Sequence, residues 1–161
     1  MNTIKHLDCS LRDGGYYNNW DFNDDLINQY LQVLDSINID FCEIGFRFFN
    51  NNGFKGSCAF TTEEFLNSLT IPQNIRIAIM INANELISNE EFILERLKKL
   101  IPLRASQSKV DMVRVACHSE IIEKILPVFE FLHDYGYISC CNITQISDKN
   151  NQKLTELSGL L

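Results

Sequence analysis

Residues 75–81 read Ile-Arg-Ile-Ala-Ile-Met-Ile, and six of these seven side chains are apolar. A short apolar run of this kind is typical of a strand that is covered on both faces of a sheet. Four other runs have the same character, at residues 4–11, 41–46, 110–116 and 137–143. The sequence therefore predicts five strands.

Amphipathic segments separate these runs. Apolar side chains recur at helical spacing in residues 24–37, 119–135 and 150–161. Thr61 or Thr62 is suited to cap a helix that ends near Leu69, and Asn89 is suited to cap one that ends near Leu100. We expect five helices, one after each strand.

The spacing of the strands indicates a repeated strand–helix unit. Their predicted starts at residues 4, 41, 75, 110 and 137 are 37, 34, 35 and 27 residues apart. Alternating strands and helices form a parallel sheet with right-handed crossovers. Two α/β architectures fit five such units, a doubly wound five-stranded sheet and a partial (β/α)₈ (TIM) barrel.

The length of 161 residues bears on the second architecture. A complete (β/α)₈ barrel typically has about 250 residues and rarely fewer than about 200. We therefore expect residues 1–161 to form a single, incomplete barrel domain. In either architecture, ligands bind at the carboxyl ends of the strands, so polar residues at these ends are the candidates for function.

The composition excludes several classes of partner. The chain has 14 Lys and Arg against 21 Asp and Glu, and its net charge is −7. A nucleic-acid or anionic membrane surface would need a basic patch, and a membrane span would need about 20 apolar residues in a row. None of the six cysteines forms a Cys-x-x-Cys pair. Together with an N-terminus unlike a signal peptide, this predicts a cytoplasmic protein with reduced thiols.

Charged residues concentrate where the first predicted strand ends, in the run from Asp8 to Tyr16, Asp-Cys-Ser-Leu-Arg-Asp-Gly-Gly-Tyr. Two glycines here allow a sharp turn. A carboxylate at this position suits Mg²⁺ or Mn²⁺, and Arg12 beside it could stabilise an oxyanion. The alternative is an internal ion pair between Arg12 and Asp13 that closes the turn.

This run resembles the D-x-T-L-R-D-G signature of the metal-dependent carbon–carbon lyases and synthases, with Ser10 in place of Thr. That superfamily includes 3-hydroxy-3-methylglutaryl-CoA lyase and 4-hydroxy-2-oxovalerate aldolase, and the longer run at 12–22 is similar to its aldolase-like branch. Residues 41–47 and 142–147 resemble the second and fifth strands of the same barrels. The resemblance extends over residues 4–148.

The resemblance implies a role for each matching residue. Asp13 would be a ligand of a divalent metal, Mg or Mn, and Arg12 would stabilise the enolate oxygen of a pyruvate-like intermediate. Glu43 would hold Arg12 through a bidentate pair, or form a generic buried ion pair with the same contact. Asp8 would position the loop from behind the ligands.

The sequence departs from the family at two points. The family carries further metal ligands in a His-x-His pair on its seventh strand, and this chain has none. A histidine assigned to acid–base chemistry in the aldolases is replaced by Tyr16. A tyrosine can donate a proton, but with a reference pKa of about 10 it is a poor base at neutral pH.

Three further residues lie at the ends of later strands. Arg114 and His118 belong to the fourth strand or its end, and Asn142 belongs to the fifth. They could contact the substrate or support residues that do. For His118, a bond to the backbone at the start of a helix is the alternative, and for Asn142 the alternative is closure of a turn.

The leading hypothesis is the N-terminal part of a metal-dependent aldolase that acts on a small 2-oxo acid through an enolate, with little activity alone. An alternative is a non-catalytic assembly module whose open strand edges pair with a chain that supplies further strands. A flavodoxin-like or receiver-like domain ranks lower, because the third predicted strand ends in Asn82 rather than the aspartate that a receiver needs.

Overall fold

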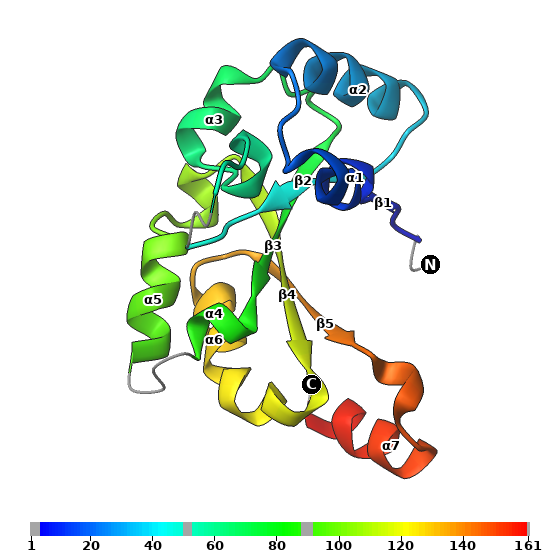
Figure 1. The fold of residues 1–161 in the computed structure, drawn as a ribbon, viewed down its shortest axis with the longest axis vertical. Coiled ribbons are helices and arrows are strands. Elements are labelled where there is room, and N and C mark those ends of the chain that lie inside the picture. The colour runs from blue at the N-terminus through cyan, green and yellow to red at the C-terminus, as the bar shows by residue number, and fades with distance from the viewer. Residues whose placement is uncertain (1–3, 50–52, 88–91, 161) are drawn as a thin grey trace.

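The computed structural model describes residues 4–49, 53–87 and 92–160. Its centre is one parallel sheet of five strands in the order β1-β2-β3-β4-β5 (Figure 1). The strands are β1 (Leu7–Asp8), β2 (Phe41–Phe46), β3 (Arg76–Asn82), β4 (Val110–His118) and β5 (Ile138–Thr144).

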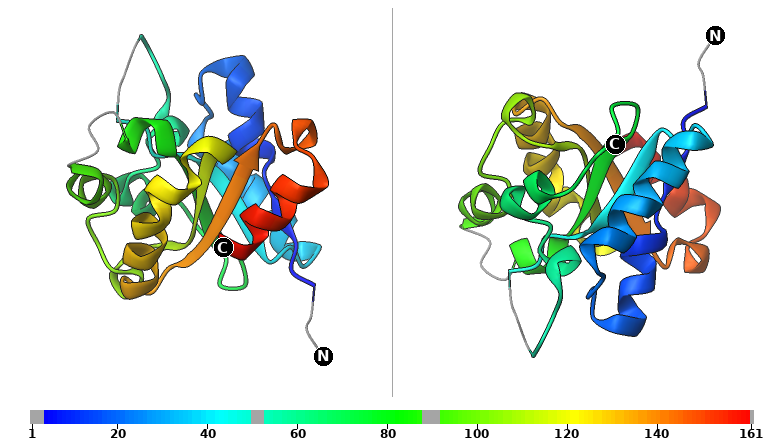
Figure 2. Two further views of the ribbon diagram at one scale, coloured as in Figure 1. Left: turned by 90° about the horizontal axis from the view of Figure 1, so that it is seen from below. Right: turned by 90° about the horizontal axis from the view of Figure 1, so that it is seen from above.

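Helices follow the strands and pack around the sheet (Figure 2). They are α1 (Ser10–Asn18), α2 (Asp24–Ser36), α3 (Glu63–Ser68), α4 (Ala83–Leu86), α5 (Ile93–Leu100), α6 (Ile122–Asp134) and α7 (Asn151–Leu160). Among the described residues, no helix is both long and apolar enough to cross a bilayer.

The order of the strands decides between the two predicted architectures. In a doubly wound sheet the order reverses at a switch point, whereas here every strand pairs with its neighbour in sequence. The sheet curls into a half-barrel of five parallel strands that alternate with helices. The predicted α/β class and the partial barrel are therefore confirmed.

The core lies between the sheet and its helices. The largest fully buried side chains are aliphatic and come from both layers: Ile27, Leu31, Ile44, Leu66, Ile77, Ile79, Ile81, Leu86, Leu97, Ile101, Ile122 and Ile125. β2 is buried along its whole length, while β5 exposes its first three residues. The expectation of five fully covered strands is thus wrong for β5, which pairs with β4 along one edge only within the described chain.

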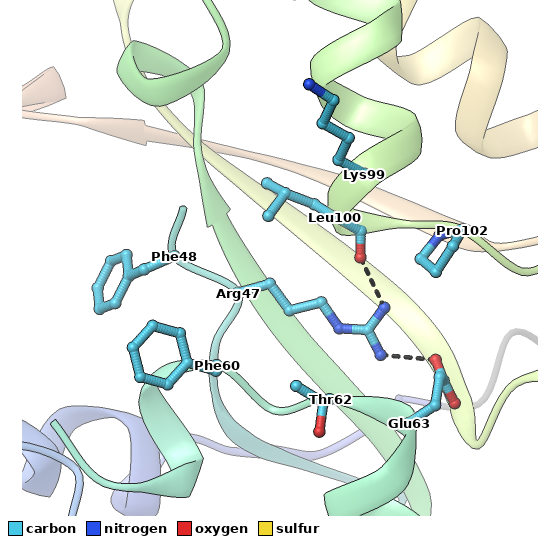
Figure 3. Close-up of a pocket in the computed structure, with 8 residues that line it drawn as sticks. All are labelled: Arg47, Phe48, Phe60, Thr62, Glu63, Lys99, Leu100 and Pro102. Carbon is cyan, nitrogen blue, oxygen red and sulfur yellow. Dashed lines mark hydrogen bonds and ion pairs between the residues drawn. The ribbon is translucent and has the colours of Figure 1, made fainter. Parts of the chain in front are cut away.

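Arg47 joins three segments on the helical side of the sheet (Figure 3). Its side chain is only 4% exposed and donates to the carbonyl oxygens of Thr61 and Leu100, each at 2.9 Å. A third bond, at 2.6 Å, reaches Glu63 at the start of α3. Although burial opposes it, hydrogen bonds from Ser108 and Arg47 hold the pKa of Glu63 below its ordinary value. Arg47 therefore fixes the end of β2 against α3 and α5.

The structure corrects the prediction for the first strand. Residues 4–11 were expected to be extended, but β1 covers only Leu7–Asp8 and α1 begins at Ser10. The Asp8 carboxylate accepts hydrogen bonds from the Ser10 backbone at 3.1 Å and from its hydroxyl at 2.9 Å. This local contact starts a helix where the apolar pattern alone suggested a strand.

The other boundaries shift by smaller amounts. The helix expected from Asn89 begins at Ile93 as α5, and Asn89 itself lies outside the described residues. The helix expected at 119–135 opens with a short 3₁₀ turn, Ser119–Ile121, before α6. Gly136 has a φ of 84° and ends α6 in the left-handed conformation, as the sequence predicted.

Candidate functional site

Polar side chains from four strands and from α1 meet at the carboxyl end of the sheet. α1, which carries Arg12 and Asp13, follows β1 directly and packs against β2 (Figure 1). Asp8 anchors this arrangement, since it binds Ser10 and also accepts a bond from the Tyr30 hydroxyl at 3.0 Å. Asp8 therefore links β1 to the start of α1 and to α2.

Glu43, on β2, is the centre of the polar cluster and its side chain is fully buried. One oxygen, Oε2, accepts from Arg12 Nε at 2.8 Å and from Arg114 Nη1 at 2.9 Å. The other, Oε1, is buried without a hydrogen-bond partner in the described part of the chain. The expected bidentate pair is thus wrong: Arg12 donates only through Nε, because its Nη1 donates to Asp13 instead.

Arg12 keeps its charge in this setting. Burial disfavours the charge on Arg12, but its hydrogen bond to Glu43 and the nearby negative charges outweigh burial and raise the pKa of the guanidinium. For the thiol of Cys9, which lies 3.3 Å from Arg114 Nη1, the surroundings favour the uncharged form instead. Burial, with the charge of Glu43, raises the pKa of Cys9, so this thiol is a poor nucleophile.

Arg114 extends the network across the sheet. Besides Glu43, it donates through Nη2 to Asn142 Oδ1 on β5 at 2.9 Å. Next to this pair, Thr144 Oγ1 donates to the Cys117 carbonyl at 3.2 Å and lies 3.1 Å from His118 Nδ1. These contacts join the carboxyl ends of β4 and β5 beside the Arg114–Asn142 pair.

An aromatic cluster covers one side of Arg12. Trp20 Nε1 donates to the Arg12 carbonyl at 2.9 Å, and the Arg12 guanidinium lies 5.8 Å from the centre of the Phe46 ring. Tyr16 packs edge-on against Trp20 with ring centres 4.8 Å apart, while Tyr16 itself is 63% exposed. The cluster fixes the backbone of α1 beneath Arg12 and leaves Tyr16 at the rim.

A cavity of about 210 Å³ opens between the network and the aromatic cluster. Its lining consists of Arg12, Tyr16, Phe46, Met80, Asn82, Asn84, Ala116, Cys117, His118, Asn142 and Thr144. The structure therefore brings together four predicted residues, Arg12, Tyr16, His118 and Asn142. Glu43 and Arg114 form the network behind them, while Asp8 and Asp13 do not line the cavity.

Sequence reasoning gave no role to Met80, Ala116 or Thr144 in this lining. The alternation of side chains between the two faces of a strand was the signal that could have identified Ala116 and Thr144, because residues two apart on a strand share a face. Once Arg114 and Asn142 are placed inside the curl, Ala116 and Thr144 follow on the same face of β4 and β5. The direction in which the sheet curls is a tertiary property, and no local pattern revealed it.

The described residues do not make a complete site for Mg or Mn. Asp13 is exposed, its side chain being 60% accessible, and its carboxylate is paired with Arg12. Within residues 4–49, 53–87 and 92–160, no group of three or more His, Cys, Asp or Glu side chains could hold a metal ion. These ions take about six oxygen ligands, so Asp13 would supply only one of them.

No protein-family model matches the chain, and no curated protein matches it. Among solved structures, it is similar to one described as "Crystal structure of the N-terminal domain of a putative aldolase from Bacteroides vulgatus", with a TM-score of 0.76 and 29% sequence identity. The similarity covers 96% of this chain and 50% of that chain, so this chain spans half the length of the solved one. It supports an aldolase-like fold.

The two glycines of α1 predict opposite effects on stability. A Cβ on Gly14 would meet Phe22 at an ordinary 3.6 Å, whereas a Cβ on Gly15 would fall 1.9 Å from Trp20 Cδ1. Gly14→Ala should raise the free energy of unfolding by about 0.5–1 kcal/mol, because alanine favours the helix. Gly15→Ala should lower it by about 1–3 kcal/mol through overpacking.

Urea titration followed by the fluorescence of Trp20, the only tryptophan, measures both changes. Equal effects of the two substitutions would contradict the close packing of Trp20 on Gly15, since the two variants add the same methyl group to the same helix.

Proposed function

We propose that the chain carries the arginine-bearing part of an aldolase site, which binds a small 2-oxo acid and stabilises the enolate formed when a carbon–carbon bond is broken or made. The observation that carries this proposal is the pair of arginines on the buried Glu43, beside a cavity at the carboxyl end of a half-barrel. The similarity to an aldolase domain supports it.

The chemistry follows from where charge develops. In a retro-aldol cleavage, the hydroxyl on the leaving carbon gives up its proton to a base and becomes the carbonyl of the released product. The electron pair of the broken carbon–carbon bond forms the double bond of the enolate, and the negative charge moves onto the former oxo oxygen. Arg12 lines the cavity, and its Nη2 has no hydrogen-bond partner among the described residues. A fixed cation with an unused N–H stabilises such an oxyanion without reorganising during the reaction. Glu43 holds the guanidinium in place but does not itself line the cavity.

Tyr16 and Asp13 have supporting roles in the proposed reaction. Tyr16, at the rim, is positioned to donate a proton to an intermediate through its hydroxyl. Asp13 would offer one ligand to Mg or Mn, and further ligands would have to come from residues outside the described chain. We therefore expect weak metal binding and little turnover from this chain alone.

Binding of oxalate, a planar analogue of the pyruvate enolate, tests the role of Arg12. Arg12→Met should weaken oxalate binding about tenfold or more, because a charge-assisted hydrogen bond is lost from a partly buried site. Arg104→Met removes the same charge from an exposed side chain and serves as the control. Titration followed by ¹H–¹⁵N NMR measures the affinity.

Oxalate binding that is equally tight in the Arg12→Met and Arg104→Met variants would contradict the proposed function. Absence of oxalate binding to the unaltered chain at tens of millimolar would contradict it as well.

A second candidate function, an assembly module, is supported by the open edge of the half-barrel. β1 and β5 each pair on one side only within the described chain. Next to β1, α2 and its C-terminal cap present Leu26, Val33 and Ile37 at helical spacing, with exposures of 52%, 55% and 60%. Exposed apolar stripes beside unpaired strands are typical of surfaces that receive another polypeptide. On this view the partner supplies further strand–helix units.

Light scattering during size-exclusion chromatography tests the second candidate. The chain should associate in a concentration-dependent way, and Val33→Glu should abolish association by placing a charge within the α2 stripe. Phe54→Glu is the control, since Phe54 is 70% exposed but lies in the loop after β2. A monomer at every concentration would contradict an assembly role.

A further inference from the structure

Three residues on neighbouring strands form one row across the inner face of the sheet. The register pairs Asn82 of β3 with Ala116 of β4, and Ala116 with Asn142 of β5. All three line the 210 Å³ cavity. Two amide side chains therefore flank a methyl group, and the small side chain in the middle leaves space between them.

The direction of each amide is fixed chemically. Asn82 Oδ1 accepts from the Asn84 backbone N–H at 3.0 Å, which caps α4. Asn142 Oδ1 accepts from Arg114 Nη2 at 2.9 Å. Both partners are donors only, so the atom that binds them must be oxygen in each amide. The amino groups, Nδ2 of Asn82 and of Asn142, have no hydrogen-bond partner in the described chain.

The cavity therefore offers more donors than acceptors. The amino groups of Asn82 and Asn142 and Arg12 Nη2 are unpaired along its lining, while the oxygens of these two amides are already used. The third amide of the lining, on Asn84, brings both a donor and an acceptor. No aspartate or glutamate belongs to the lining, and Glu43 behind it is shared by two arginines. A cavity of this kind favours a small ligand rich in oxygen acceptors and negatively charged.

We propose that Asn82 and Asn142 form a carboxylate subsite, in which their amino groups donate to the carboxylate of a small oxo acid across Ala116. This inference rests on the proposed function and deepens it, because it assigns the substrate carboxylate to β3 and β5 while Arg12 serves the oxo oxygen. It also predicts a short ligand, since the cavity that these residues line holds only about 210 Å³.

Aspartate substitutions test the two amino groups without disturbing the fold. Asn82→Asp keeps the oxygen that caps α4, and Asn142→Asp keeps the oxygen that binds Arg114; each replaces a donor by a negative oxygen. Asn23→Asp is the matched control, because the Asn23 side chain also caps a helix through Oδ1, at 2.8 Å from the Asp25 N–H, and lies away from the cavity. All three variants add the same charge.

The probe is pyruvate, titrated by ¹H–¹⁵N NMR against the unaltered chain, the three aspartate variants and Arg12→Met. Methyl pyruvate, propionate and inorganic phosphate are the comparison ligands. We expect Asn82→Asp and Asn142→Asp each to weaken pyruvate binding about tenfold or more, and Asn23→Asp to leave it unchanged. Methyl pyruvate, which lacks the carboxylate charge, should bind weakly to the unaltered chain.

The outcomes separate this subsite from the proposed function. Pyruvate binding that needs Arg12 but survives both aspartate substitutions would overturn the subsite and leave the aldolase proposal standing. Propionate binding that equals pyruvate binding and needs the asparagines, but not Arg12, would support the subsite and overturn the aldolase proposal. Phosphate that binds as tightly as pyruvate at the same residues would overturn the assignment to a carboxylate, and absence of pyruvate binding would overturn both.

Discussion

Glu43 is a carboxylate with no exposure to solvent, and two arginines donate to a single one of its oxygens. Burying a charge is costly unless it is paired, and removing one partner of a buried pair typically costs about 3–5 kcal/mol. Arg12 comes from α1 and Arg114 from β4, so this one carboxylate joins the first, second and fourth strand–helix units. The position of α1, the direction of Arg12 and the shape of the cavity all depend on it.

The curl of the sheet places the rest of the site around that pair. Because the strands follow one another in sequence order, residues at equivalent heights on β3, β4 and β5 form rows across the inner face. Arg114 belongs to one row, Ala116 to the next and His118 to the third. The register in which β2 pairs with β3 shifts between Glu43 and Gly45, so the regular ladder is interrupted next to the buried carboxylate. The site is thus a product of sheet geometry more than of any one loop.

Much of this could be predicted from the sequence, and the reasons differ from residue to residue. β2 was predicted at its observed bounds, because Phe41–Phe46 is apolar except for Glu43 and is buried throughout. Thr62 caps α3 as expected, since a hydroxyl before two glutamates is a local signal. The resemblance predicted that Arg12 pairs with Glu43, and the structure has this pair. It is joined by one hydrogen bond from Arg12 Nε and not by the expected bidentate contact.

The rest depended on how the folded chain packs and bonds around each residue. Gly15 looked like a turn residue, but it lies within α1 and is small because Trp20 packs against it. The orientation of Asn82 follows from its cap on α4, and that of Asn142 follows from Arg114, 28 residues away. The spacing of residues along one strand does not reveal how either amide is oriented, because each amide oxygen binds a donor from another element, α4 for Asn82 and β4 for Asn142.

The most direct test of this account is hydrogen exchange at the side-chain Nε–H of Arg12, measured by ¹⁵N NMR. Because this group donates to a fully buried carboxylate, it should exchange slowly with water in the unaltered chain and at least tenfold faster in Glu43→Gln, where the acceptor loses its charge. The Nε–H of Arg47, which donates to the Thr61 carbonyl, is an internal reference that should not change. Slow exchange at Arg12 in both proteins, or fast exchange in both, would contradict the claim that Glu43 holds the site together.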